Sequence, residues 1–159
     1  MKVIAWSPNL TPERAAEADV EYVPTKEELL ERSDFVSIHM VLSPTTRGLL
    51  KGEDLKHMKS TAFLINTSRG PIVEEEGLIE VLKSKTIAGA ALDVFDVEPL
   101  PPDHALRKLD NVLLSPHVGY ISVANYKAMY GTTAENVLNF LEGRPVKIMG
   151  PEAGMFGTF

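Results

Sequence analysis

Short, uninterrupted apolar runs recur along the chain and alternate with segments of mixed polarity. Most of the runs end at Ser, Pro, Asn or Asp residues, which predicts a strand followed by a turn. Strands that are continuously apolar are typical of parallel sheets covered on both faces. The pattern therefore predicts an α/β fold with helices on both faces of a mostly parallel sheet. The predicted strands are 3–6, 21–23, 35–40, 62–66, 87–92 and 111–114.

The segments between the predicted strands carry signals for helix starts. Thr11 precedes Pro12, which fits a cap followed by a proline in the first helical turn. Thr25 and Glu28 fit a capping box. Two more helices are predicted at 52–58 and 73–84.

The end of the chain predicts one longer helix and a tail. The helix begins near Ser122, and Gly143 and Pro145 would end it. Its apolar residues recur at helical spacing, at Tyr126, Tyr130, Ala134, Val137, Leu138 and Leu141. We therefore expect one domain over residues 1–145 and a tail over 146–159.

An excess of acidic side chains limits the possible partners. The 159 residues include 16 Lys and Arg against 22 Asp and Glu, for a formal net charge of −6. This charge argues against nucleic acid, whose binding requires a basic face. No apolar run approaches the roughly 20 residues that cross a bilayer, and the apolar start is too short for a signal peptide. We therefore expect a cytoplasmic protein without a nucleic-acid or membrane partner.

Charged side chains follow three successive predicted strands. Arg69 comes after the strand 62–66, Asp93 and Glu98 after 87–92, and His117 after 111–114. If these strands are parallel, their carboxyl ends lie along one edge, where open α/β sheets bind ligands. An arginine can bind a carboxylate with two hydrogen bonds, and a histidine can exchange protons near neutral pH. The arrangement suits an anionic substrate and proton transfer beside a redox centre.

The residues around these positions also resemble a known family. The matching stretches are Asp34–His39, Ser43–Leu49, Phe63–Gly70, Gly89–Phe95, Glu98–Pro101 and Ser115–Tyr120. On them the chain is similar to the D-isomer-specific 2-hydroxyacid dehydrogenases, which include glyoxylate/hydroxypyruvate reductases and phosphoglycerate dehydrogenases. The resemblance runs from about Val3 to Pro145 and implies a Rossmann-like, NAD(P)-binding domain.

The resemblance also implies a reaction, the transfer of a hydride between NAD(P)H and a small 2-oxo acid or D-2-hydroxy acid. Arg69 would bind the carboxylate and carbonyl of the substrate. His117 would protonate the carbonyl oxygen during reduction, and Glu98 would favour the protonated form of His117. Each residue also has a simpler interpretation: Arg69 as a surface ion-pair partner, His117 as a satisfied loop histidine, and Glu98 as a solvated loop acid.

By the same resemblance, several residues would line a dinucleotide pocket. Asp93 would lie near the nicotinamide carboxamide, although it could instead cap a loop or helix. Ser7 stands where NAD-specific relatives often carry an acid for the ribose hydroxyls, so the choice between NAD and NADP stays open. The other expected lining residues are Met40, Thr67, Ser68, Arg69, His117 and Gly119.

One departure from the family pattern is that the sequence has no Gly-x-Gly-x-x-Gly turn for a pyrophosphate. The first strand, the glycine-rich turn and the first helix are missing, so the chain resembles the carboxyl half of a dehydrogenase. The central strand of the sheet would then be absent, which leaves strand edges exposed. Three outcomes are open: the second strand moves beside the fourth, a second copy pairs with the gap as a homodimer, or a separate amino-terminal half completes the sheet. A catalytically silent or partner-completed nucleotide-binding domain is thus the alternative to an enzyme.

Other reactive sites find little support. The sequence contains no cysteine, which excludes disulfides and thiolate sites. His39, His57 and His104 lack metal-ligand spacing, and we expect no metal. The acidic run Glu74–Glu76 is expected to be a solvated helix face.

Overall fold

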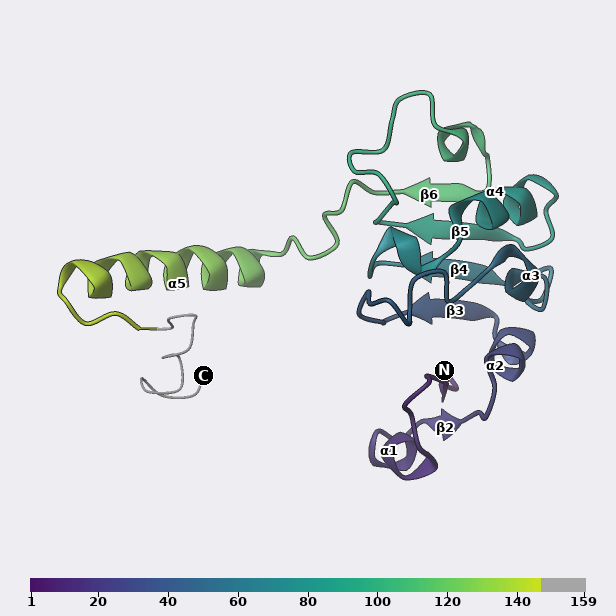
Figure 1. Ribbon diagram of the computed structural model, residues 1–159, viewed down its shortest axis with the longest axis horizontal. Coiled ribbons are helices and arrows are strands. Elements are labelled where there is room, and N and C mark those ends of the chain that lie inside the picture. The colour runs from purple at the N-terminus through teal and green to yellow at the C-terminus, as the bar shows by residue number, and fades with distance from the viewer. Residues whose placement is uncertain (147–159) are drawn as a thin grey trace. The chain divides into compact units, whose positions relative to one another are not determined.

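The computed structural model describes residues 1–146, so all but the first residue of the expected tail falls outside the described residues. The chain divides into two compact units, Met1–Gly119 and Tyr120–Phe159. Of the described elements, the first unit contains all the strands and the second contains one long helix (Figure 1).

A four-stranded parallel sheet forms the centre of the first unit. Its strands follow one another in chain order and are β3 (Phe35–Ile38), β4 (Phe63–Asn66), β5 (Gly89–Leu92) and β6 (Val112–Leu114). In register, Val36 lies beside Leu64, Leu64 beside Ala90, and Ala90 beside Val112. The predicted α/β class with a mostly parallel sheet is confirmed, and the register places the carboxyl ends of all four strands at one edge.

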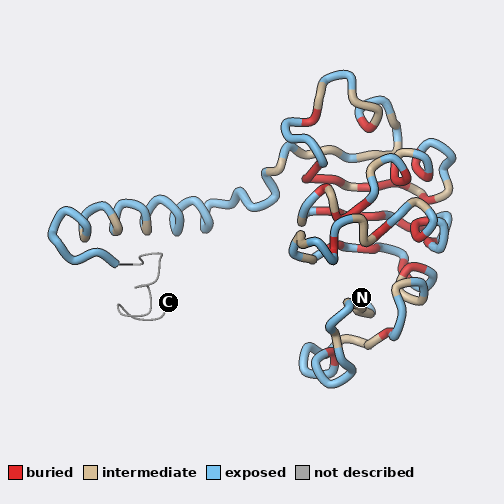
Figure 2. The backbone as a smooth tube through the Cα atoms, viewed as in Figure 1, coloured by how far each residue is buried: buried red, intermediate tan, exposed pale blue. Residues whose placement is uncertain are grey.

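Helices cover one face of this sheet and enclose the hydrophobic core. Alternate residues of β3, β4 and β5, such as Leu64, are buried, whereas those of β6 are at most half-buried (Figure 2). Leu30, Leu55 and Leu82 from three helices pack against this face and are almost completely buried. The covering elements are α2 (Lys26–Arg32), α3 (Gly52–Leu55), α4 (Glu75–Lys83) and the 3-10 turn η2 (Ala105–Lys108).

The opposite face of the sheet is apolar and open to solvent among residues 1–146. Phe35 is 61% exposed, Phe63 41% and Leu113 71%. The rings of Phe35 and Phe63 stack, with centroids 5.8 Å apart. The expected cover of helices on both faces is therefore seen on one face within the described residues. The exposed rings mark the face that lacks this cover.

A separate two-stranded sheet lies at the start of the chain. β1 (Ile4–Ala5) pairs in parallel with β2 (Glu21–Tyr22), and α1 (Pro12–Glu17) connects them. Ala15 of α1 and Val23, directly after β2, are buried. β1 pairs with β2 and β3 pairs with β4, so the strands on either side of the missing central strand belong to separate sheets. The first of the three expected outcomes, in which the second strand of the complete domain moves beside the fourth, is not what the structure shows: these two strands are β1 and β3, and β1 pairs with β2.

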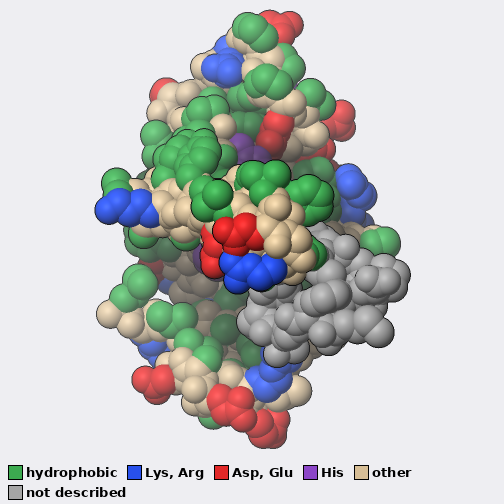
Figure 3. Space-filling model, turned by 90° about the vertical axis from the view of Figure 1, so that its left-hand side faces the viewer, with side chains coloured by type: hydrophobic (Ala, Val, Ile, Leu, Met, Phe, Trp, Pro, Cys, Tyr) green, Lys and Arg blue, Asp and Glu red, His purple; other side chains and the backbone are tan. Residues whose placement is uncertain are grey.

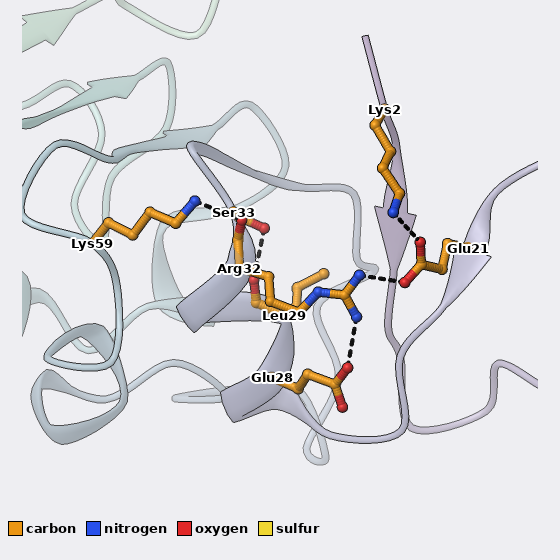
Figure 4. Close-up of polar contacts among 7 residues, drawn as sticks. All are labelled: Lys2, Glu21, Glu28, Leu29, Arg32, Ser33 and Lys59. Atoms are coloured by element: carbon orange, nitrogen blue, oxygen red, sulfur yellow. Dashed lines mark hydrogen bonds and ion pairs between the residues drawn. The ribbon is translucent and has the colours of Figure 1, made fainter.

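A network of ion pairs links the small sheet to the helix that leads into β3 (Figure 4). Glu21 of β2 accepts from Arg32 of α2 and also pairs with Lys2, whose Nζ lies 2.6 Å from Glu21 Oε2. Arg32 contacts Glu28 one helical turn earlier at 2.6 Å. Lys59 donates to the backbone carbonyl of Arg32 at 2.9 Å. The hydrogen bonds that Glu21 accepts from Lys2 and from Arg32 lower its pKa.

The second unit consists of α5 (Val123–Leu141) and the residues that flank it. Ser122 caps the helix by accepting the backbone N–H of Asn125 at 3.1 Å, which confirms the predicted start. None of its residues is buried in the described structure, and hydrophobic side chains lie on its surface (Figure 3). The exposed apolar residues are Val123, Tyr126, Met129, Tyr130, Val137, Leu138, Phe140 and Leu141.

The predicted element boundaries agree with the structure within a few residues. Thr11 and Thr25 cap α1 and α2 through their side chains, as the sequence predicts. The strands are shorter than the apolar runs: β3 ends two residues before its run does, whereas β4, β5 and β6 begin one or two residues after theirs. The loops at the carboxyl edge of the sheet follow these strands directly. Those loops carry the candidate site.

Candidate functional site

Glu98 and His117 form the closest pair of ionisable groups at the carboxyl edge of the sheet. His117 follows β6 and Glu98 lies in the loop after β5, and the His117 Nδ1 to Glu98 Oε2 distance is 2.7 Å. The second carboxylate oxygen, Oε1, accepts the backbone N–H of Phe95 at 2.9 Å. Burial opposes ionisation of Glu98, but the bonds to His117 and Phe95 and the charges of His117 and Arg69 outweigh it and lower its pKa. Glu98 is therefore a carboxylate at neutral pH and orients the imidazole through Nδ1.

The backbone of His117 adopts a left-handed conformation, with φ of 56°. Such a conformation is costly for residues other than glycine and is retained where neighbouring contacts enforce it. Here the carboxylate of Asp93 enforces it, because it accepts the N–H groups of Val118 at 3.0 Å and Gly119 at 2.8 Å. A Cβ atom at Gly119 would lie 2.9 Å from Asp93 Oδ2, so the close approach requires glycine. Asp93 thus fixes the turn that presents the imidazole.

The pKa of Asp93 reflects this arrangement. Burial raises it, but hydrogen bonds from Ser115, Gly119 and Val118 and the charge of His117 outweigh burial and lower it. Of the two interpretations of Asp93, the loop cap is the one visible in these contacts. Its contact with a nicotinamide carboxamide stays a prediction.

The turn that carries Arg69 is held from both sides. Asn66, 1% exposed at the end of β4, accepts the N–H of Ser68 at 3.0 Å and donates to the carbonyl of Arg69 at 3.0 Å. Ser68 Oγ donates to the carbonyl of Ile38 at 2.7 Å, which ties the turn to β3. The Arg69 guanidinium is exposed, and its charge helps to lower the pKa of Glu98. Arg69 and the Glu98–His117 pair therefore share one region of this edge.

Gly70 lets the Arg69 turn approach the loop after β5. A side chain at this position would collide with the backbone carbonyl of Phe95. The same loop continues from Phe95 to Glu98, which contacts His117. One loop, residues 93–104, therefore touches the turn of the arginine and the turn of the histidine, and it sets their relative position.

The remaining residues predicted to line a dinucleotide pocket occupy two places. Met40, half-buried after β3, and Thr67, exposed after β4, lie with Ser68 at the same edge as Arg69. Ser7 follows β1 in the separate two-stranded sheet, where its carbonyl accepts the N–H of Leu10 at 3.2 Å. The structure thus brings Met40, Thr67, Ser68, Asp93 and Gly119 to the edge that holds His117 and leaves Ser7 on the other sheet.

This edge fits the nicotinamide end of a dinucleotide. It offers hydroxyl groups, the ordered turn at Gly119 and an ionised pair, the polar groups that a pocket uses to orient a ligand. The sequence holds no glycine-rich turn for a pyrophosphate, so the residues present would hold the nicotinamide and not the phosphates.

Glu75 and His104 form a further contact that the sequence does not reveal. His104 Nε2 lies 3.1 Å from Glu75 Oε1, and both side chains are mostly buried. The run Glu74–Glu76 was expected to be solvated, but Glu74 also has a partner, since its Oε2 accepts the N–H of Gly52 at 3.0 Å. Glu74 and Glu75 lie at the start of α4, and neither contact could be predicted from the local sequence, because the partner residues are more than 20 positions away.

Residues 1–146 contain neither a metal-site arrangement nor a bilayer-spanning helix. No group of His, Asp and Glu there has the arrangement of a metal site. None of the helices described there combines the length and apolar character that a bilayer-spanning segment needs.

Comparisons with known proteins identify the family and agree with the fold. A family model described as the NAD-binding domain of D-isomer-specific 2-hydroxyacid dehydrogenases covers residues 1–119. A glyoxylate reductase of Thermofilum pendens is 50% identical over 115 residues, which are 72% of this chain and 34% of that protein.

Solved structures agree with the family match. A phosphoglycerate oxidoreductase from Vibrio cholerae superposes with a TM-score of 0.81 at 33% identity, over 90% of this chain and 46% of that one. An NAD-complexed D-isomer-specific 2-hydroxyacid dehydrogenase from Lactobacillus delbrueckii gives a TM-score of 0.75 at 31% identity, over 93% of this chain and 48% of that one. The chain spans less than half the length of these relatives.

Proposed function

Because this chain belongs to the D-isomer-specific 2-hydroxyacid dehydrogenases and matches their NAD-binding domain, we propose that it takes part in hydride transfer between NAD(P)H and a small 2-oxo acid or D-2-hydroxy acid. The observation that carries this proposal is the 2.7 Å contact of Glu98 with His117 in the electrostatic range of Arg69. A cation for the substrate and a positioned proton donor are the groups that carbonyl reduction requires from a protein.

Each of these residues has a distinct role in the proposed reaction. Arg69 binds the carboxylate of the acid with its planar guanidinium, a geometry that lysine does not reproduce. Glu98 holds Nδ1 of His117, so proton exchange with the carbonyl or hydroxyl oxygen of the substrate falls to Nε2. The dinucleotide, when bound, supplies or accepts the hydride.

The same edge would hold the nicotinamide end of the cofactor. Thr67 and Ser68 offer hydroxyl groups, Met40 offers an apolar contact, and the Asp93–Gly119 turn offers polar groups in a fixed position. We propose NAD or NADP as the cofactor, because Ser7 carries no charge that repels a 2′-phosphate. A cytoplasmic location fits this proposal, since the sequence has no cysteine for disulfides.

A second candidate function is a nucleotide-binding domain that is silent until a partner completes it. The separate two-stranded and four-stranded sheets support it, because within residues 1–146 β1 and β3 each have a neighbouring strand on one side only. Unpaired strand edges bind further strands readily. Two partners fit: an amino-terminal half of the kind that the longer relatives carry, and a second copy of this chain in a homodimer.

Nucleotide titration and activity assays separate the two candidates. NADH and NADPH are titrated into the purified chain, and reduction of glyoxylate and hydroxypyruvate is then followed by the loss of NADH absorbance. The enzyme proposal expects turnover that Arg69→Ala, Glu98→Gln and His117→Ala each reduce by at least about 100-fold, the low end of acid–base contributions. The silent-domain proposal expects no turnover until the amino-terminal half of a relative is added. Absence of nucleotide binding in both preparations would exclude both candidates.

A further inference from the structure

The Glu75–His104 pair fastens α4 to the loop 93–104, which carries Glu98. The two side chains are only 24% and 19% exposed, and His104 Nε2 lies 3.1 Å from Glu75 Oε1. His104 Nδ1 accepts the N–H of Leu106 at 3.3 Å. A neutral imidazole that accepts at Nδ1 carries its hydrogen at Nε2, so the ring donates to the Glu75 carboxylate. The contact is therefore a directed hydrogen bond between two elements of the fold.

Further contacts connect His104 to the middle of this loop. His104 is the residue that caps η2, and Arg107 of η2 reaches back along the loop. Its Nη2 donates to the carbonyl of Leu100 at 2.8 Å, and its Nε donates to the carbonyl of Pro101 at 2.9 Å. Leu100 is itself buried in the core. Three prolines restrict the backbone of this stretch, at positions Pro99, Pro101 and Pro102.

The start of the same loop is fixed independently. The N–H of Asp93 donates to the carbonyl of Asn66 at 3.0 Å, and Phe95 is buried. Glu75 also faces this part of the loop, because its charge, after burial, raises the pKa of Asp96. Glu98 thus lies between two anchors, one at β5 and one at His104. Of the two, only the second depends on a pair of ionisable side chains.

We propose that Glu75 and His104 are positioning residues that hold the loop 93–104 so that the Glu98 carboxylate meets His117. Neither residue contacts His117 in the described contacts; they act through the loop. This positioning role concerns the Glu98–His117 contact itself, and it rests on the proposed function only where that contact serves catalysis.

The test follows the ionisation of Glu98 by NMR in the complete chain, with no nucleotide added. His117→Asn gives the reference, since it removes the imidazole and raises the pKa of Glu98. We expect His104→Leu to raise the pKa of Glu98 by at least roughly half as much. Glu75→Ala is the second variant and tests the same contact if the first fails to fold. Glu75→Gln should retain the wild-type pKa, because its amide oxygen still accepts from Nε2.

Glu76→Gln is the matched control, since Glu76 is an exposed neighbour in the same helical turn. A role confined to stability predicts a different result: His104→Leu and Glu75→Ala lower the melting temperature and leave the pKa of Glu98 at its wild-type value. That result would overturn the proposal. Because the measurement needs no cofactor, a failure of nucleotide binding or turnover leaves it unaffected and is recorded separately.

Discussion

The carboxylate of Asp93 offers the sharpest test of how the site is held together. Asp93→Asn keeps the shape of the side chain but replaces one acceptor oxygen by an amide N–H₂. One of the N–H groups of Val118 and Gly119, now bonded at 3.0 and 2.8 Å, then faces a donor. The turn that holds His117 in its left-handed conformation then keeps only one of its two hydrogen bonds to residue 93.

The size of the effect follows from these two bonds. A hydrogen bond to a charged group contributes about 1.5–3 kcal/mol, and a stranded buried donor costs about 1–3 kcal/mol. Val118 and Gly119 lie at the surface, where water can replace part of the lost bond. We therefore expect Asp93→Asn to lower the free energy of unfolding by about 2 kcal/mol at pH 7.

The matched control is Asp96→Asn, three residues further along the same loop. Burial and the Glu75 carboxylate raise the pKa of Asp96, so the fold opposes its negative charge. Removing that charge should leave stability within about 0.5 kcal/mol of wild type or slightly increase it. Two chemically identical substitutions in one loop are thus expected to differ because their surroundings differ.

The pH dependence provides the decisive measurement. Folding lowers the pKa of Asp93, so its ionised form stabilises the protein above the unfolded pKa of about 3.9, and this stabilisation is lost as the pH falls through the folded value. Urea denaturation should show the full difference between wild type and Asp93→Asn at pH 7 and a smaller one below about pH 4. Equal stability of Asp93→Asn and Asp96→Asn at pH 7, or a difference that does not change with pH, would refute this reasoning.

Three further predictions concern the rest of the first unit, and chemical denaturation checks each. Asp54→Asn should lower the free energy of unfolding by about 2 kcal/mol, because Lys26 loses its charged partner. The Lys26 Nζ lies 2.7 Å from Asp54 Oδ1, and both side chains are mostly buried. If the double variant Lys26→Met/Asp54→Asn costs as much as the two single variants together, the two side chains are not coupled. Gly70→Ala should cost more than about 3 kcal/mol, since its Cβ would overlap the backbone of the loop after β5, and a wild-type midpoint would show that the two turns do not pack as described. Leu113→Ala on the open face should lower the free energy of unfolding by less than about 1 kcal/mol. Leu64→Ala on the covered face should lower it by about 2–5 kcal/mol. Similar losses for the two variants would mean that both faces are covered.

Much of the fold was predictable because its signals lie in neighbouring residues. The caps at Thr11 and Thr25 are recognised from short patterns, and the helix expected from about Ser122 begins there. Apolar runs predicted the parallel strands, and residues directly after β4, β5 and β6 had to meet at one edge once the strands were parallel. The convergence of Arg69 and His117 with the Glu98 carboxylate followed from that geometry and from the family motifs.

Only the tertiary structure decided which distant residues touch and which faces stay open. His104 and Glu75 are separated by 29 positions, and Asp93 and Gly119 by 26, so no local pattern links them. The sequence likewise left open how the strands on either side of the gap would pair, and the structure keeps two sheets. Propensities and periodicity act over a few residues, whereas such contacts depend on how the whole chain packs, which is why the sequence determined the elements and the edge but not the contacts that hold the edge in place.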